Sequence, residues 1–265
     1  MPILTTDHLT RQFGDLKAVD DLNLSVEPGE VFGLLGPNGA GKTTSIKMII
    51  TLLPPTSGGA YISGLDVVHN PSEVRRLIGY VPQILSADGT LTGRENLMIF
   101  AKLYDIPRGE RAERVHESLE FMGLSDAADK LVKNYSGGMI RRLEIAESML
   151  HRPKVLFLDE PTIGLDPVGR KAVWDHIEKL RVDFGTTIFL TTHYMEEADK
   201  LCKRVGIMSQ GKLAIIGEPS DLKSSLDIEN PTLEDVFTNY TCGTLESGDS
   251  FRQASQARRT ARRLA

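Results

Sequence analysis

The first part of the chain shows a strand, a glycine-rich loop and a helix in direct succession. Apolar and polar residues alternate over 22–26, which predicts a half-buried strand. The turn residues Pro28-Gly29 separate it from 31–35, a run of apolar residues around one glycine, as in a strand buried on both faces. Glycines then recur through 36–41, and apolar positions at helical spacing follow over 45–53, ahead of two prolines. This order places a glycine loop between a buried strand and a helix.

Strand and helix patterns alternate along most of the remaining sequence. Between about 92 and 152 the pattern is helical: Thr92 and Glu95 form a capping box, and 108–122 is a charged amphipathic segment. The other predicted strands are 60–62, 78–81, 155–158, 187–190, 205–208 and 213–216. The other predicted helices are 167–181, 195–202 and 232–240. Such alternation predicts an α/β fold with a mostly parallel, helix-covered sheet, and the residues from about 84 to 152 form an inserted helical lobe.

Composition and charge narrow the classes of function. The chain has 265 residues, of which 40% are hydrophobic and 25% charged, as in an ordinary globular protein of one large domain with an inserted lobe. The net charge is −5, and five arginines without an acid in residues 251–265 leave −10 for the preceding part. An acidic body argues against a protein that binds duplex nucleic acid. No nucleic-acid partner is therefore expected.

The sequence shows neither a membrane-spanning pattern nor an export signal. Its apolar runs fall far short of the ~18 residues that cross a bilayer, and residues 1–14 lack a basic start with an apolar run. Cys202 and Cys242 lack metal-ligand spacing, and we interpret them as free thiols in a reducing compartment. Residues 241–265 are interpreted as a disordered basic tail, with contact to anionic lipid as the alternative.

The glycine-rich segment fits the phosphate-loop pattern G-x-x-x-x-G-K-S/T through Gly36, Gly41, Lys42 and Thr43. In such a loop the backbone N–H groups surround a β-phosphate, the lysine neutralises the β and γ phosphates, and the threonine hydroxyl binds Mg²⁺. A simple glycine turn is the alternative, which the flanking strand and helix disfavour. The predicted ATP-binding residues are Gly36, Pro37, Asn38, Gly39, Ala40, Gly41, Lys42, Thr43 and Thr44.

Two carboxylates, Asp159 and Glu160, follow directly on the predicted strand 155–158. The carboxyl ends of strands form the edge at which α/β sheets bind ligands. Asp159 is placed to hold Mg²⁺, and Glu160 to polarise an attacking water, as the acidic residues of phosphate-loop enzymes do. An acidic helix cap is the alternative for this pair, and the phosphate loop upstream makes it the weaker one.

A third motif, Ser136-Gly137-Gly138, opens a predicted helix and leaves its terminal N–H groups available to an anion. Alone, this motif is most often a helix cap. With the phosphate loop, Asp159-Glu160, Asp166 and His193, however, it stands in the order and spacing of ATP-binding cassette (ABC) ATPases. The chain resembles this family over residues 1 to about 240. The resemblance implies a phosphate-loop NTPase of the ABC type, with an antiparallel N-terminal β part and an inserted helical lobe.

The resemblance also implies roles for single residues. Phe13 matches the aromatic residue that stacks on adenine, with a core aromatic as the alternative. Gln83 matches the glutamine that senses Mg²⁺ and the attacking water, and His193 matches a γ-phosphate contact, so both join Glu160 as catalytic candidates. In isolation, Gln83 would be a loop residue and His193 a satisfied histidine. Asp166 matches the loop that links two ATP sites.

In this family two ATP-binding subunits pack head to tail, and each ATP lies between one Lys42 loop and the other subunit's Ser136-Gly137-Gly138. The resemblance therefore implies ATP and Mg²⁺ as cofactors, a second ATP-binding subunit in a homodimer, and an integral membrane permease subunit. The protein would be cytoplasmic and peripheral on the inner face of the cell membrane. The resemblance also implies that a short helix of the permease docks on the lobe. The candidate contacts for that helix are Ile84, Leu85, Leu103 and Tyr104. For each of them, packing in the core of the protein is the alternative.

A narrower resemblance points to the daunorubicin-resistance type of exporter ATPase. It lies in Tyr135-Ser136-Gly137-Gly138-Met139 with the residues after it, and in Leu233-Glu234-Asp235-Val236-Phe237. It implies export of a drug, lipid or polysaccharide. The alternative function is a non-transport ABC ATPase that acts on DNA or ribosomes, but the sequence shows neither long coiled coils nor a second cassette. A phosphate-loop kinase or GTPase is a third reading, and no Asn-Lys-x-Asp guanine motif supports it.

Overall fold

The computed structural model describes residues 1–242, which fold around two β-sheets. The N-terminal sheet is antiparallel, with the strand order β2-β1-β4-β5. The central sheet has the order β10-β9-β3-β8-β7-β6 and is parallel except for β10. The strands are β1 (Leu4–Phe13), β2 (Leu16–Val26), β3 (Val31–Leu35), β4 (Ser57–Ile62), β5 (Leu65–Asp66), β6 (Ile78–Val81), β7 (Val155–Asp159), β8 (Thr187–Thr192), β9 (Arg204–Ser209) and β10 (Lys212–Gly217). The predicted α/β fold with an antiparallel N-terminal part is confirmed.

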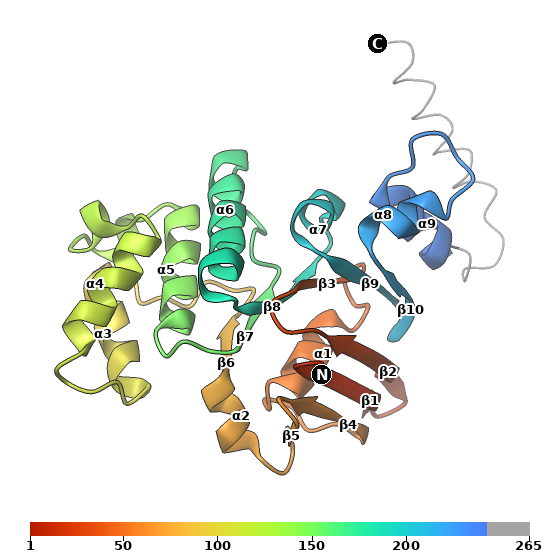
Figure 1. Ribbon diagram of the computed structural model, residues 1–265, viewed down its shortest axis with the longest axis horizontal. Helices are drawn as coiled ribbons and strands as arrows, with labels where there is room; N and C mark the ends of the chain where they lie inside the picture. The colour runs from red at the N-terminus through yellow and green to blue at the C-terminus, as the bar shows by residue number, and fades with distance from the viewer. Residues whose placement is uncertain (243–265) are drawn as a thin grey trace.

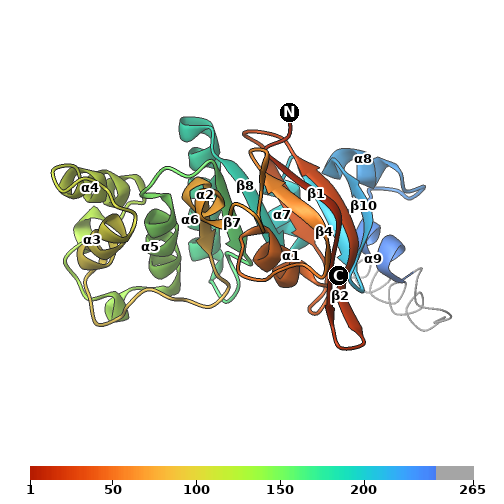
Figure 2. The ribbon, with the colours of Figure 1, turned by 90° about the horizontal axis from the view of Figure 1, so that it is seen from below.

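Helices cover the central sheet and form a lobe at one end of the molecule (Figure 1). They are α1 (Lys42–Ile49), α2 (Pro71–Leu77), α3 (Gly93–Leu103), α4 (Arg111–Phe121), α5 (Gly137–Met149), α6 (Pro167–Phe184), α7 (Met195–Leu201), α8 (Pro219–Ser224) and α9 (Leu233–Cys242). The helical lobe consists of α3, α4 and α5, and Figure 2 shows it at the end of an elongated molecule, opposite α8 and α9. The predicted lobe bounds of about 84–152 and domain bounds of 1–240 stay predictions.

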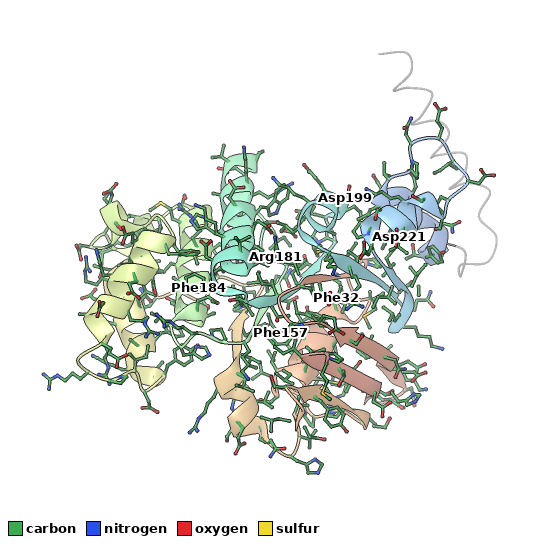
Figure 3. The ribbon with its side chains drawn as sticks, viewed as in Figure 1. Phe32, Phe157, Arg181, Phe184, Asp199 and Asp221 are labelled. Carbon is green, nitrogen blue, oxygen red and sulfur yellow. The ribbon has the colours of Figure 1, made fainter. Side chains whose placement is uncertain are left out.

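Side chains of the central strands alternate between two apolar layers, because successive residues of a strand point to opposite faces. Phe32, Phe157 and Phe189 form the middle of one layer, between this sheet and the antiparallel sheet. The ring centroid of Phe189 on β8 lies 5.4 Å from that of Phe32 on β3 and 5.5 Å from that of Phe157 on β7. Figure 3 labels Phe32 and Phe157 near the centre of the molecule. Leu156 and Leu158 face the other layer, which α5, α6 and α7 cover. Burial on both faces explains the continuous apolar runs of these strands.

Helix α1 differs from its predicted range of 45–53. It begins at Lys42, so Lys42 and Thr43 belong to its first turn, where backbone N–H groups have no partner within the helix. It ends at Ile49, since Thr51 has a φ of 69°, a left-handed conformation that an α-helix does not continue. The phosphate loop therefore leads into the helix without an intervening turn.

Within residues 1–242, no helix is both long and apolar enough to cross a bilayer. Cys202 is a free, buried thiol, and burial raises its pKa well above the ordinary value, which makes it a poor nucleophile. Most of the basic tail predicted at 241–265 lies outside the described residues, with all of its arginines.

Glu147 on α5 is expected to make the stability of the fold dependent on pH. Its side chain is 3% exposed, and among the described residues its Oε1 has no hydrogen-bond partner. Burial, followed by the charge of Glu144, raises the pKa of Glu147 from 4.5 to about 8. Between these two values the folded chain keeps a proton that the unfolded chain releases, so the free energy of unfolding falls as pH rises.

Glu147→Gln is expected to remove this dependence. At pH 5 the variant and the parent should unfold at similar temperatures, whereas at pH 9 the variant should be the more stable, by on the order of 2–4 kcal/mol. Thermal unfolding of both proteins at the two pH values measures the difference directly, and other titrating groups cancel. A difference that stays constant with pH would show that Glu147 is ionised in the folded chain at pH 5.

Candidate functional site

The phosphate loop connects β3 to α1, and its backbone passes too close to its neighbours for side chains at two positions. A Cβ on Gly36 would lie 2.5 Å from the carbonyl oxygen of Met208, and one on Gly41 would lie 2.4 Å from that of Ala18. Gly41 also has a φ of 106°, which L-residues rarely adopt. The glycines therefore let the loop fold against the sheet, with the N-terminus of α1 facing its interior.

Lys42 is buried inside this loop, with an exposed fraction of 4%. Its ammonium donates hydrogen bonds to the carbonyl oxygens of Gly36, at 2.8 Å, and Pro37, at 3.2 Å. It also forms an ion pair with Glu160, with 3.2 Å between Nζ and Oε1. A buried charge requires such partners, and here they are the loop itself and the carboxylate predicted to act on water.

Glu160 lies between Lys42 and His193 at the carboxyl end of β7. Its Oε2 is 2.7 Å from His193 Nδ1, and its carboxylate is 6% exposed. Its backbone has a φ of 50°, the left-handed conformation that is uncommon for a residue with a side chain. The backbone N–H of Glu160 donates to Oγ1 and the carbonyl oxygen of Thr191, at 3.1 and 3.0 Å, and these bonds hold the unusual conformation.

Asp159, one residue earlier, faces the first turn of α1. Its Oδ1 accepts hydrogen bonds from Thr43 Oγ1, at 3.2 Å, and from Thr191 Oγ1, at 2.5 Å. The Asp159 side chain is buried, and its charge acts on the neighbouring strand β6. There burial, assisted by Asp159, raises the pKa of Tyr80 to about 12. The two predicted metal-binding residues with oxygen donors on α1 and β7, Thr43 and Asp159, are thus in contact.

One pocket of about 290 Å³ is lined by nine of the predicted site residues and by Ala18. It is lined by Ala18, Asn38, Gly39, Ala40, Gly41, Lys42, Thr43, Thr44, Gln83 and Glu160. Phe13 does not line it: its ring lies at the end of β1, is 45% exposed, and has the Arg11 guanidinium 4.6 Å from its centroid. The phosphate loop, Gln83 and Glu160 therefore meet in a single chain, whereas the predicted adenine contact stays a prediction.

The Ser136-Gly137-Gly138 motif does not line this pocket either, but caps α5. The Ser136 hydroxyl accepts a hydrogen bond from the N–H of Met139, at 3.3 Å. Gly138 packs on the backbone of α6, since a Cβ there would lie 3.1 Å from Cα of Gly169. Asp166 caps α6 by accepting from the N–H of Gly169, at 2.6 Å. The motif and Asp166 thus lie at two neighbouring helix N-termini, and neither lines the phosphate pocket of its own chain.

Two residues of the site were not predicted from the sequence. Thr191, at the end of β8, forms hydrogen bonds with Asp159, the last residue of β7, and with Glu160, which follows it. Glu197 on α7 is fully buried and accepts from Thr162 Oγ1, at 2.8 Å, and Trp174 Nε1, at 2.9 Å, so that it ties the loop after Glu160 to α6 and α7. Burial raises the pKa of Glu197. The only sequence signal for Thr191 was its position directly after the predicted strand 187–190.

Comparison with known proteins agrees with this arrangement. The model of the ABC transporter family matches residues 19–163. The daunorubicin/doxorubicin resistance ATP-binding protein DrrA of Streptomyces peucetius is 47% identical over 84% of this chain and 67% of its own length. Nod factor export ATP-binding protein I of Cupriavidus metallidurans is 41% identical over 84% of this chain and 73% of its own length.

Solved structures are similar in the same way. The structure of an ATP-binding subunit of an ABC transporter superposes with a TM-score of 0.79, is 26% identical, and covers 90% of this chain and 99% of its own. Sequence motifs, fold and site geometry thus agree. The chain belongs to the ABC transporter family, as one of its ATP-binding and ATP-hydrolysing subunits.

Proposed function

We propose that this chain powers an exporter: ATP joins two copies head to tail, hydrolysis separates them, and this motion drives a permease subunit in the membrane. The observation that carries the proposal is the pocket lined by the phosphate loop, Gln83 and Glu160, with the N-terminus of α5 outside it. Because that N-terminus offers free N–H donors to an anion, a second copy is the simplest source of the other half of each site.

Within the pocket the chain's own groups divide the work of hydrolysis. Lys42 and the backbone N–H groups of the loop hold the β and γ phosphates. Glu160 holds the attacking water and accepts its proton, and His193, 2.7 Å from its carboxylate, orients that carboxylate and contacts the γ-phosphate. The Ser136 end of the partner's α5 and the Asp166 loop complete the site from the other side.

Mg²⁺ fits the oxygen donors beside the loop. Thr43 Oγ1 and Asp159 Oδ1 lie 3.2 Å apart, and Gln83 lines the same pocket. Across residues 1–242, no three His, Cys, Asp or Glu side chains form a metal site by themselves. This suits a cation that takes one or two protein oxygens and fills its shell with phosphates and water. Bound there, Mg²⁺ would neutralise charge that develops on the phosphate oxygens.

Export, rather than import or a role on DNA, is supported by the names of the similar proteins. One of them confers daunorubicin and doxorubicin resistance, and another is a Nod factor export protein. We infer that the cargo is a drug, lipid or polysaccharide, and that the chain works at the inner face of the cell membrane through its permease partner. Ile84, Leu85 and Leu103, which expose 80, 44 and 68% of their surface, are the proposed contacts with that partner.

The test is affinity purification of the tagged Glu160→Gln protein from detergent-solubilised native cells in the presence of ATP. We expect a polytopic membrane protein in stoichiometric amount, identified by mass spectrometry. The purified variant should also form a dimer by light scattering at saturating ATP, and Lys42→Ala should stay monomeric. Ribosomal or DNA-repair proteins without a membrane protein would overturn the transport proposal, and a monomeric Glu160→Gln protein would overturn the two-copy site.

A further inference from the structure

Helix α5 carries a buried ion pair in its second turn, and neither of its members is a predicted site residue. Arg141 and Glu144 expose 1 and 2% of their side chains, and Arg141 Nη1 lies 3.0 Å from Glu144 Oε2. Arg141 is among the largest fully buried side chains of the described residues. Burying two charges is costly unless further hydrogen bonds satisfy them, so their remaining partners indicate what the pair does.

All of these partners lie on the short segment that follows β6. The Arg141 guanidinium donates to the carbonyl oxygens of Pro82, at 2.6 Å, and Gln83, at 2.8 Å. The Glu144 carboxylate accepts from the backbone N–H groups of Ser86 and Ala87, and from Ser86 Oγ at 3.2 Å. Charge-assisted bonds of this kind are about twice as strong as neutral ones. The pair thus binds residues 82–87 at both ends.

The bound segment, residues 82–87, contains residues with different surroundings. Gln83 lines the phosphate pocket, whereas the next two residues, Ile84 and Leu85, project outward with exposed fractions of 80 and 44%. The helix that binds the segment begins at Gly137, next to Ser136. One hydrogen-bonded unit therefore contains a residue of the chain's own phosphate pocket, an exposed apolar tip and the motif proposed to reach the ATP of a second copy.

We propose that Arg141 and Glu144 are positioning residues for hydrolysis, which set the place of Gln83 in the phosphate pocket by fastening its backbone to α5. The inference rests on the proposed role of Gln83 and deepens it. Displacement of α5 by a partner at Ser136 or at the Ile84-Leu85 tip then moves Gln83 toward or away from the phosphates. A pair that only stabilised the lobe would bind other elements of the lobe instead.

A double-mutant cycle on ATP hydrolysis tests the inference. Arg141→Lys keeps the charge but lacks the planar fork that reaches two carbonyl oxygens and a carboxylate together. We expect it to lower kcat about tenfold while KM for ATP changes less than about twofold, and we expect Gln83→Ala to lower kcat by a similar factor. If Arg141 acts through Gln83, the double variant should be no slower than Gln83→Ala alone. Independent effects, about 100-fold in the double variant, would overturn the inference.

Arg142→Lys is the matched control, because Arg142 is the next residue of α5 and donates to Met122 O, at 2.7 Å, inside the lobe. Its kcat should match that of the parent, and the double variant with Gln83→Ala should be as fast as Gln83→Ala alone. Glu144→Gln, which keeps the side-chain shape, repeats the cycle from the other partner should Arg141→Lys fold poorly. An unchanged kcat in Gln83→Ala would contradict the proposed role of Gln83 itself, whereas additivity contradicts only the positioning by Arg141.

Discussion

Glu160→Gln is expected to lower the rate of ATP hydrolysis by about 100-fold or more and to leave ATP binding intact. Glutamine has nearly the same shape but cannot accept a proton from water. We expect the pocket to keep its shape in the variant. Lys42 Nζ lies 3.2 Å from Glu160 Oε1, and without that charge it still has the carbonyl oxygens of Gly36 and Pro37 as hydrogen-bond partners. Release of phosphate under single-turnover conditions measures the rate of hydrolysis, and the dissociation constant for ATP measures binding.

Glu196→Gln is the matched control for this experiment, because Glu196 is exposed on α7, near the same end of the sheet. Its rate should stay within about twofold of the parent, as is usual for surface substitutions. Turnover of Glu160→Gln at a tenth of the parental rate or higher would assign the proton transfer to another group.

Lys42→Ala is expected to weaken ATP binding by about 100-fold, which corresponds to about 3 kcal/mol. Two effects add. The variant loses the charge-assisted bonds of a buried ammonium to the phosphates, worth about 1.5–3 kcal/mol each. It also frees the carbonyl oxygens of Gly36 and Pro37, which Lys42 holds at 2.8 and 3.2 Å, so the loop is no longer fixed before the nucleotide arrives.

Titration calorimetry with ATP gives the affinity of Lys42→Ala, and Lys47→Ala supplies the comparison, since Lys47 is exposed on the same helix. The comparison variant should bind ATP like the parent. An affinity of Lys42→Ala within about threefold of the parent would mean that the backbone N–H groups alone hold the phosphates.

The central strands could be predicted from the sequence because they are buried on both faces. The segments 31–35 and 78–81 coincide with β3 and β6. Strand β1, in contrast, escaped prediction, since its buried residues are Leu4, Thr6 and Leu9. A bulge around His8, whose φ is 46°, lengthens the spacing from two residues to three. An alternating pattern cannot continue through such a bulge.

The sequence motifs predicted the phosphate loop, Asp159 and Glu160 as site residues. They did not predict how these residues contact one another. Strand β8 follows β7 in the chain but lies between β3 and β7 in the sheet. This order brings Thr191 beside Asp159, and no local pattern encodes it. The contacts of Arg141 with the segment around Gln83 could not be predicted for a similar reason, because the two partners lie 58 residues apart in the sequence. Chemistry within a motif is local, whereas contacts between motifs depend on how the sheet is assembled.

The backbone conformation of Glu160 affects which inactive forms of this chain would accumulate in a cell. Its φ of 50° strains any residue with a Cβ, and glycine adopts it freely. A chance substitution by glycine would thus remove the carboxylate and relieve strain in one step, whereas most damaging substitutions lower the amount of folded protein. In the proposed two-copy assembly, such an abundant, inactive chain would bind both to the permease and to copies of the parental chain. Loss of function at this position would therefore be dominant, while loss through unfolding elsewhere would be recessive.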